Sequence, residues 1–120
     1  MITSKWFKEE EFKRCSPSCS LQHMQQSSID MLDKSRDMAG VPFVLSSAFR
    51  SSEWDRKKGR TGTGAHTSGH AIDIKCTDNA MRWKIINALF TAGFKRIGIA
   101  KTYIHADNSP VHTQEVIWMY

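Results

Sequence analysis

The sequence predicts a single α+β domain, in which a small, mainly antiparallel sheet has helices packed on one of its faces. Its 120 residues are the length of one ordinary domain, and we expect that domain to span residues 1–120. Hydrophobic residues make up 40% of the chain and charged residues 24%, which is typical of a folded globule. The expected helices and strands fall in separate blocks rather than alternating, and this order favours an α+β architecture.

The first third of the chain is expected to hold one short amphipathic segment, a loop and one helix. Residues 6–13 form the amphipathic segment, and the serines and proline of residues 15–20 predict a loop. The helix begins near Ser27 or Ser28, because either hydroxyl can cap it, and it runs to Ala39. A glycine and then a proline follow closely, as is common after a helix ends.

The middle of the chain predicts two strands separated by a long polar segment. Residues 43–49 are mostly apolar and predict the first strand. Residues 50–65 are polar and rich in glycine, and we expect them to form a loop, which at this length is usually functional or mobile. The second strand covers about residues 71–76.

The last third predicts one helix followed by three short strands. One of residues 77–79 caps this helix, which runs to about Ala92. Trp83, Ile86 and Phe90 repeat at helical spacing and are predicted to face the core. The three strands are expected at residues 96–99, 103–107 and 115–119.

A histidine and aspartate motif stands out within this pattern. The run from His66 to Asp73 has the form His-x-x-Gly-x-Ala-x-Asp, and His105 lies in a later strand. If the strands that carry Asp73 and His105 pair, the two side chains can approach one ion, and a turn at Gly69 lets His66 fold back over them. Two imidazoles and one carboxylate leave a fourth position open, which is typical of catalytic zinc.

Alternation along these two strands separates a polar face from an apolar one. The apolar face is expected to carry Ile72 and Ile74 in one strand and Ile104 and Ala106 in the other. His70 forms a His-x-x-x-His pair with His66, but Gly69 argues against the helix that this metal-binding spacing needs. We therefore expect His70 to line the pocket, and His23 and His112 to be exposed or hydrogen-bonded.

Four segments in order resemble the zinc D-Ala-D-Ala carboxypeptidase and L-Ala-D-Glu endopeptidase family, whose members cut peptide bonds in peptidoglycan. The resemblance rests on residues 6–12, 45–51, 66–73 and 104–107. It implies the fold that this family shares with the hedgehog signalling domain.

The resemblance also implies a site. His66, Asp73 and His105 are expected to hold one zinc ion. Arg50 is expected to bind a substrate carboxylate or to polarise the scissile carbonyl, both of which suit a fixed guanidinium. Further substrate contacts are expected from Ser47, Tyr103 and His70.

The carboxylate that takes the proton of the attacking water is the open part of this site. Several family members have an acidic residue three positions before the last histidine ligand, where this chain has Thr102. Asp107 is our first choice because it shares the strand face of His105, and Glu115 is the second. A role for Asp107 in orienting a ligand is about equally supported. Thr102 also motivates an alternative function, a zinc-containing binding module without catalysis.

The net charge and the cysteine content indicate which partners and which redox compartment suit this chain. The net charge of +5 suits an anionic partner such as a bacterial wall. The basic run at residues 56–60 has only Trp54 nearby, so we expect a solvated loop and no nucleic-acid partner. Cys15, Cys19 and Cys76 are an odd set, which favours reduced thiols.

No apolar stretch or signal-type leader stands out, which predicts cytoplasmic synthesis and no stable membrane insertion. Together with the resemblance, this predicts a monomeric endolysin of a phage or prophage, which reaches the wall after release through a holin.

Overall fold

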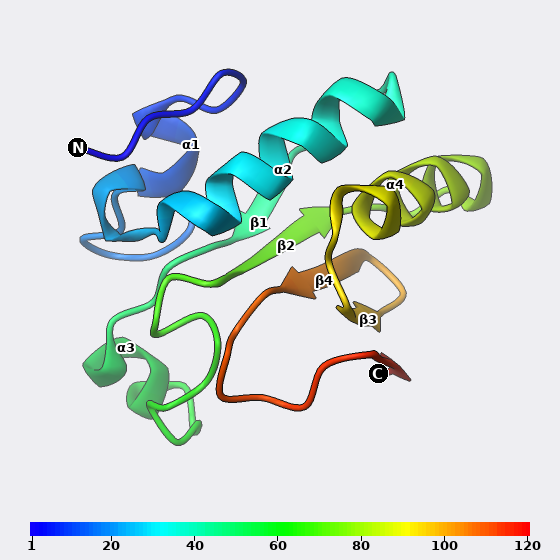
Figure 1. Ribbon diagram of the computed structural model, residues 1–120. Helices are drawn as coiled ribbons and strands as arrows, with labels where there is room; N and C mark the ends of the chain where they lie inside the picture. Colours follow the sequence, from blue (N-terminus) through cyan, green and yellow to red (C-terminus); the bar gives the residue numbers. More distant parts are fainter.

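The computed structural model describes residues 1–120 as a five-stranded sheet with two long helices lying over one face (Figure 1). The strand order is β1-β2-β4-β3-β5. The pairs β1–β2, β2–β4 and β3–β4 are antiparallel, and β3–β5 is parallel. The mainly antiparallel α+β fold predicted from the sequence is therefore confirmed. The strands are β1 (Leu45–Ser47), β2 (Ala71–Lys75), β3 (Arg96–Ile99), β4 (Tyr103–Asp107) and β5 (Val116–Met119).

The core lies between this sheet and the helices α2 and α4, which pack side by side (Figure 1). The helices are α1 (Glu9–Lys13), the 3₁₀ turn η1 (Leu21–His23), α2 (Gln26–Ala39), α3 (Ser52–Lys57) and α4 (Asn79–Ala92). Alternation works as expected, because the side chains that β2 and β4 turn toward the helices are all buried: Ile72, Ile74, Ile104 and Ala106. No helix has both the length and the apolar character that a membrane span requires.

Helix α4 has the expected bounds and is capped by the Asp78 side chain, but its packed face differs from the predicted one. Ile85, Ala88 and Leu89 are buried, whereas Trp83 is 71% exposed and Phe90 is 45% exposed. The prediction that Trp83, Ile86 and Phe90 face the core was wrong for the two aromatic residues. Both sides of α4 carry apolar residues at helical spacing, so periodicity alone does not select the side that packs.

The segment 50–65 was expected to be a loop throughout, but it contains the short helix α3. The Ser51 hydroxyl accepts the backbone N–H of Trp54 at 3.1 Å and thereby caps the helix. A serine cap followed by acidic residues in the first turn was the available sequence signal, and the surrounding glycines masked it.

The face of the sheet opposite the helices carries polar and aromatic side chains in rows set by the strand register. In the central row, Ser47 lies opposite Asp73, Asp73 opposite His105, His105 opposite Gly98, and Gly98 opposite Trp118. An irregularity in β1 between Leu45 and Ser47 turns Leu45 into the core and Ser47 onto the polar face. Residues from five strands therefore meet along one line across the sheet.

Candidate metal centre

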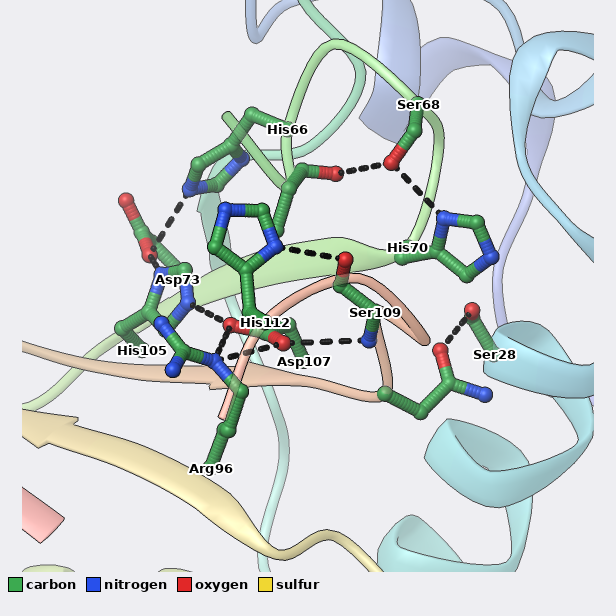
Figure 2. Close-up of polar contacts among 12 residues, drawn as sticks. Ser28, His66, Ser68, His70, Asp73, Arg96, His105, Asp107, Ser109 and His112 are labelled. Atoms are coloured by element: carbon green, nitrogen blue, oxygen red, sulfur yellow. Dashed lines mark hydrogen bonds and ion pairs between the residues drawn. The ribbon is translucent and has the colours of Figure 1, made fainter. Parts of the chain in front are cut away.

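His66, Asp73 and His105 meet on the polar face of the sheet, and all three are buried. One ligand atom from each lies within 4.8 Å of the other two. Oδ1 of Asp73 is 2.9 Å from Nδ1 of His105 and 3.3 Å from Nε2 of His66 (Figure 2). The structure thus brings together the three side chains that the sequence singled out as metal ligands.

The strands and one tight turn bring these side chains together. Asp73 in β2 pairs directly with His105 in β4, so the two side chains project side by side. His66 reaches them from the turn before β2, where Gly69 has a φ of +79°. A Cβ at Gly69 would lie 2.3 Å from the carbonyl oxygen of His23, so a side chain at this position would collide with backbone.

The ring of His66 is held from behind by a backbone carbonyl. Its Nδ1 lies 2.7 Å from the oxygen of Ala48, which can only accept a hydrogen bond. Nδ1 therefore carries a proton, and in the neutral ring the lone pair of Nε2 faces Asp73. A histidine held in one tautomer by a second acceptor is the usual arrangement at metal sites.

The ring of His105 is held by a carboxylate. Its Nε2 lies 2.6 Å from Oδ2 of Asp107, and this contact leaves Nδ1 to face Asp73. Asp107 is fully buried and its oxygens have further donors: Nε of Arg96 at 3.0 and 3.1 Å, and the backbone N–H of Ser109 at 3.1 Å (Figure 2). Asp107 is thus locked in place as the partner of His105.

The electrostatics of the cluster favour a cation. Burial alone would raise the pKa of Asp73, but hydrogen bonds and charge from His105 and His66 outweigh burial and hold that pKa well below its usual range. Burial likewise acts to raise the pKa of Asp107, and His105, Ser109 and Arg96 lower it overall. For His105, burial lowers the pKa, but Asp107 and Asp73 more than offset this and raise it. The two ionised carboxylates therefore attract positive charge to His105.

The donor set fits zinc. When both rings are neutral and keep their protons on Nδ1 of His66 and Nε2 of His105, three electron-rich atoms point at a common space, and a cation between them removes their mutual repulsion. Two imidazole nitrogens and one carboxylate oxygen form a typical zinc donor set and leave one position for water or substrate.

Arg50 lies at the β1 side of the centre, and its guanidinium is fixed by two neighbours. Its Nη1 donates to the Ser47 hydroxyl at 3.0 Å, and its Nε donates to Oδ1 of Asp55 at 3.1 Å. Asp55 belongs to α3, is 2% exposed, and also accepts the backbone N–H of Gly62 at 3.0 Å. Sequence reasoning missed Asp55 because α3 itself was missed.

Two further predicted site residues, Tyr103 and His70, lie outside the ligand cluster. Tyr103 lies on the polar face and packs against Tyr120, with ring centroids 5.2 Å apart. His70 is outside the ligand cluster, and its Nδ1 lies 2.7 Å from the Ser68 hydroxyl. Burial lowers the pKa of His70. His112 hydrogen-bonds to Ser109, as an ordinary structural histidine does.

Neither Thr102 nor Glu115 contributes to the cluster. Thr102 is exposed in the turn between β3 and β4. Glu115 is exposed beside a hollow of about 420 Å³, which Phe90 and Phe94 line between α4 and β5. Arg96 and Trp118, in contrast, lie beside the ligands and were not predicted, since their positions depend on how β3 and β5 join the sheet.

Comparison with known proteins adds two findings. The sequence matches the family model described as peptidase M15 over residues 5–107. The structure is similar to the crystal structure of the Serratia marcescens L-Ala D-Glu endopeptidase ChiX, with a TM-score of 0.63 and 18% sequence identity. That similarity covers 91% of this chain and 90% of the ChiX chain. A comparison with curated proteins found no match.

Proposed function

Because the chain belongs to the peptidase M15 family, we propose that it is a zinc-dependent peptidase that hydrolyses peptide bonds in peptidoglycan stem peptides. One observation carries the proposal beyond family membership. His66, Asp73 and His105 converge, and the second nitrogen of each ring is held by an acceptor, so that the free lone pairs point inward. Such a site suits one catalytic zinc ion.

In the proposed site, Nε2 of His66, Oδ1 of Asp73 and Nδ1 of His105 hold the metal. Bound zinc lowers the pKa of its water to about 7 and polarises the substrate carbonyl. The buried positions of the three ligands keep their geometry fixed while substrate enters.

We assign the recognition of a substrate carboxylate to Arg50. Ser47 and Asp55 take two of its five N–H groups and fix the plane of the guanidinium, which leaves the others for a substrate oxygen. Both candidate bonds suit this assignment, because the residue on the amine side, D-Ala or D-Glu, carries a carboxylate. Ser47, Tyr103 and His70 remain the proposed further substrate contacts.

We assign Asp107 the role of orienting His105, which is the second of the two roles considered from the sequence. Its oxygens are fully buried and already receive hydrogen bonds from Arg96, His105 and Ser109. A proton acceptor for water needs a lone pair within reach of that water, and Asp107 has none turned to the open side. Glu115 lies at the hollow beside α4, so neither carboxylate is assigned the proton of the attacking water.

The biological setting that we propose is the bacterial wall, with the protein acting as a monomeric endolysin of a phage or prophage after release through a holin. The net charge of +5 supports an anionic polymer as the partner. Thr102 stands where several family members have an acidic residue. This difference supports a second candidate function, a zinc-containing binding module that does not turn over substrate.

Digestion of purified peptidoglycan tests the proposal. The protein is incubated with wall, with wall plus chelator, and with wall after zinc is added back, and released fragments are read by mass spectrometry. We expect new peptide termini that vanish with chelator and return with zinc, and their sequence identifies the bond. Bound zinc without new termini supports the binding module instead, and wall left intact without bound zinc contradicts both functions.

A further inference from the structure

We propose that Tyr103, Trp118 and Tyr120 form an aromatic shelf that binds the alanyl residue on the acyl side of the scissile bond. The inference rests on the proposed function and adds a specificity subsite to it. It begins from three aromatic side chains that lie next to the metal ligands on the open face of the sheet and that the core does not use.

The shelf is continuous with the metal centre. The ring centroids of His105 and Trp118 are 5.3 Å apart. Those of Trp118 and Tyr120 are 6.1 Å apart, and those of Tyr120 and Tyr103 are 5.2 Å apart. On the β5 side of the metal centre, the indole of Trp118 is therefore the next ring after His105.

Two contacts hold the Trp118 indole against the sheet. A Cβ at Gly98 would lie 2.6 Å from Cε2 of Trp118, so the indole crosses β3 where only a glycine leaves room. The guanidinium carbon of Arg96 lies 4.9 Å from the ring centroid, while Nε of Arg96 holds Asp107 behind His105. Arg96 thus links the shelf to the residue that orients a metal ligand, as its position beside Asp107 in Figure 2 indicates.

The shelf remains open to substrate. Tyr103 and Trp118 are half-buried, and Tyr120 is 64% exposed. Helices α2 and α4 cover the other face of the sheet, so they do not occupy this side (Figure 1). Partly exposed aromatic side chains beside polar groups are typical of ligand sites, because their faces bind apolar groups.

The central row of side chains across the sheet sets the direction in which a peptide substrate would lie. Ser47 with Arg50 lies at the β1 end, the metal ligands lie in the middle, and Trp118 lies at the β5 end. A peptide across this row that places its carboxylate at Arg50 places the other side of the scissile bond on the shelf. For both candidate bonds, D-Ala-D-Ala and L-Ala-D-Glu, the acyl-side residue is alanine, and its neutral methyl group suits an aromatic face.

The test compares cleavage of stem peptides that have alanine, glycine or aspartate on the acyl side of the cut bond. We expect the natural protein to prefer alanine, and Trp118→Ala to reduce the alanine-to-glycine ratio of kcat/KM by about fivefold, mostly through KM. Tyr120→Ala is a second variant, because it alters the shelf without touching a metal ligand. Trp83→Ala is the matched control, since Trp83 is an exposed tryptophan on α4, and its ratio is expected to stay unchanged.

A binding measurement separates this inference from the proposed function. The indole N–H signals of Trp118 and Trp83 are followed by NMR while an alanyl stem peptide is titrated into the zinc-loaded protein. A shift at Trp118 but not at Trp83 supports the shelf even if no peptide is cut. An unmoved Trp118 signal, or an unchanged alanine-to-glycine ratio in both shelf variants at full zinc content, overturns it.

Discussion

At the scale of the residue, the ring nitrogen that faces away from the proposed metal site is as informative as the one that faces it, in both His66 and His105. Ala48 holds His66 and Asp107 holds His105, and both contacts fix the tautomer that a metal ligand needs. The sequence pointed to Asp107 because it shares a strand face with His105. It could not point to Ala48, since a backbone carbonyl has no sequence signature and its place is set by tertiary packing.

Asp107→Asn separates the orienting role of Asp107 from the proton-accepting role. The variant keeps one oxygen but loses the charge that polarises His105, so we expect zinc affinity to fall about 10- to 100-fold. Competition with a chromophoric chelator measures this affinity. At saturating zinc, most activity should return. A variant with unchanged zinc affinity and a kcat that zinc does not restore contradicts the orienting role and returns Asp107 to the position of general base.

At the scale of the element, short irregular segments position side chains of the proposed site. The irregularity in β1 turns Ser47 toward Asp73, and α3 supplies Asp55 to fix Arg50. Both features lie where the sequence predicted an unbroken strand and a loop. Strand propensity and glycine content predict only the average character of these two segments. Their actual backbone path depends on single hydrogen bonds.

In the turn that carries His66, Gly69 is the position where a side chain fits least well. We expect Gly69→Ala to abolish tight zinc binding and to destabilise the fold, because its Cβ would lie 2.3 Å from the His23 oxygen. Gly40→Ala is the matched control: Gly40 also has a positive φ, of +69°, but nothing lies within 4 Å of its Cβ.

We therefore expect the control to cost only about 1–2 kcal/mol of stability and to bind zinc normally. Urea unfolding and zinc titration of both variants measure the difference. Equal losses in the two variants would mean that positive φ alone, and not the contact with His23, sets the requirement for glycine at position 69.

At the scale of the whole molecule, the sheet divides the protein into a packed side and a reactive side. Core side chains fill the space between the sheet and helices α2 and α4, while the opposite face gathers Asp73, His105, Arg96 and Trp118. Metal binding at the proposed centre would be coupled to folding, because an ion there would neutralise the Asp73 carboxylate that the fold buries.

Metal removal is expected to lower the melting temperature, and the size of the loss should depend on pH. Zinc at 100 times its Kd adds about 2.7 kcal/mol to stability. Because the pKa of His105 is raised in the metal-free fold, a proton at His105 stabilises that fold below the pKa and competes with zinc.

The difference in melting temperature with and without chelator should therefore be largest above the raised pKa of His105, and it should shrink as the pH falls through that value. Differential scanning calorimetry across this range measures it. A difference that stays constant with pH would mean that no histidine in the centre exchanges its proton for the metal.

The sequence by itself determined the fold class, most element bounds, and the three side chains that converge. Period-two alternation in two strands and one glycine turn place those side chains on the same face of any sheet in which the strands pair. The tertiary structure decided which face of α4 packs, what holds each imidazole, and that β5 adds Trp118 beside His105. These depend on contacts between segments far apart in the chain, and local periodicity carries no information about such contacts.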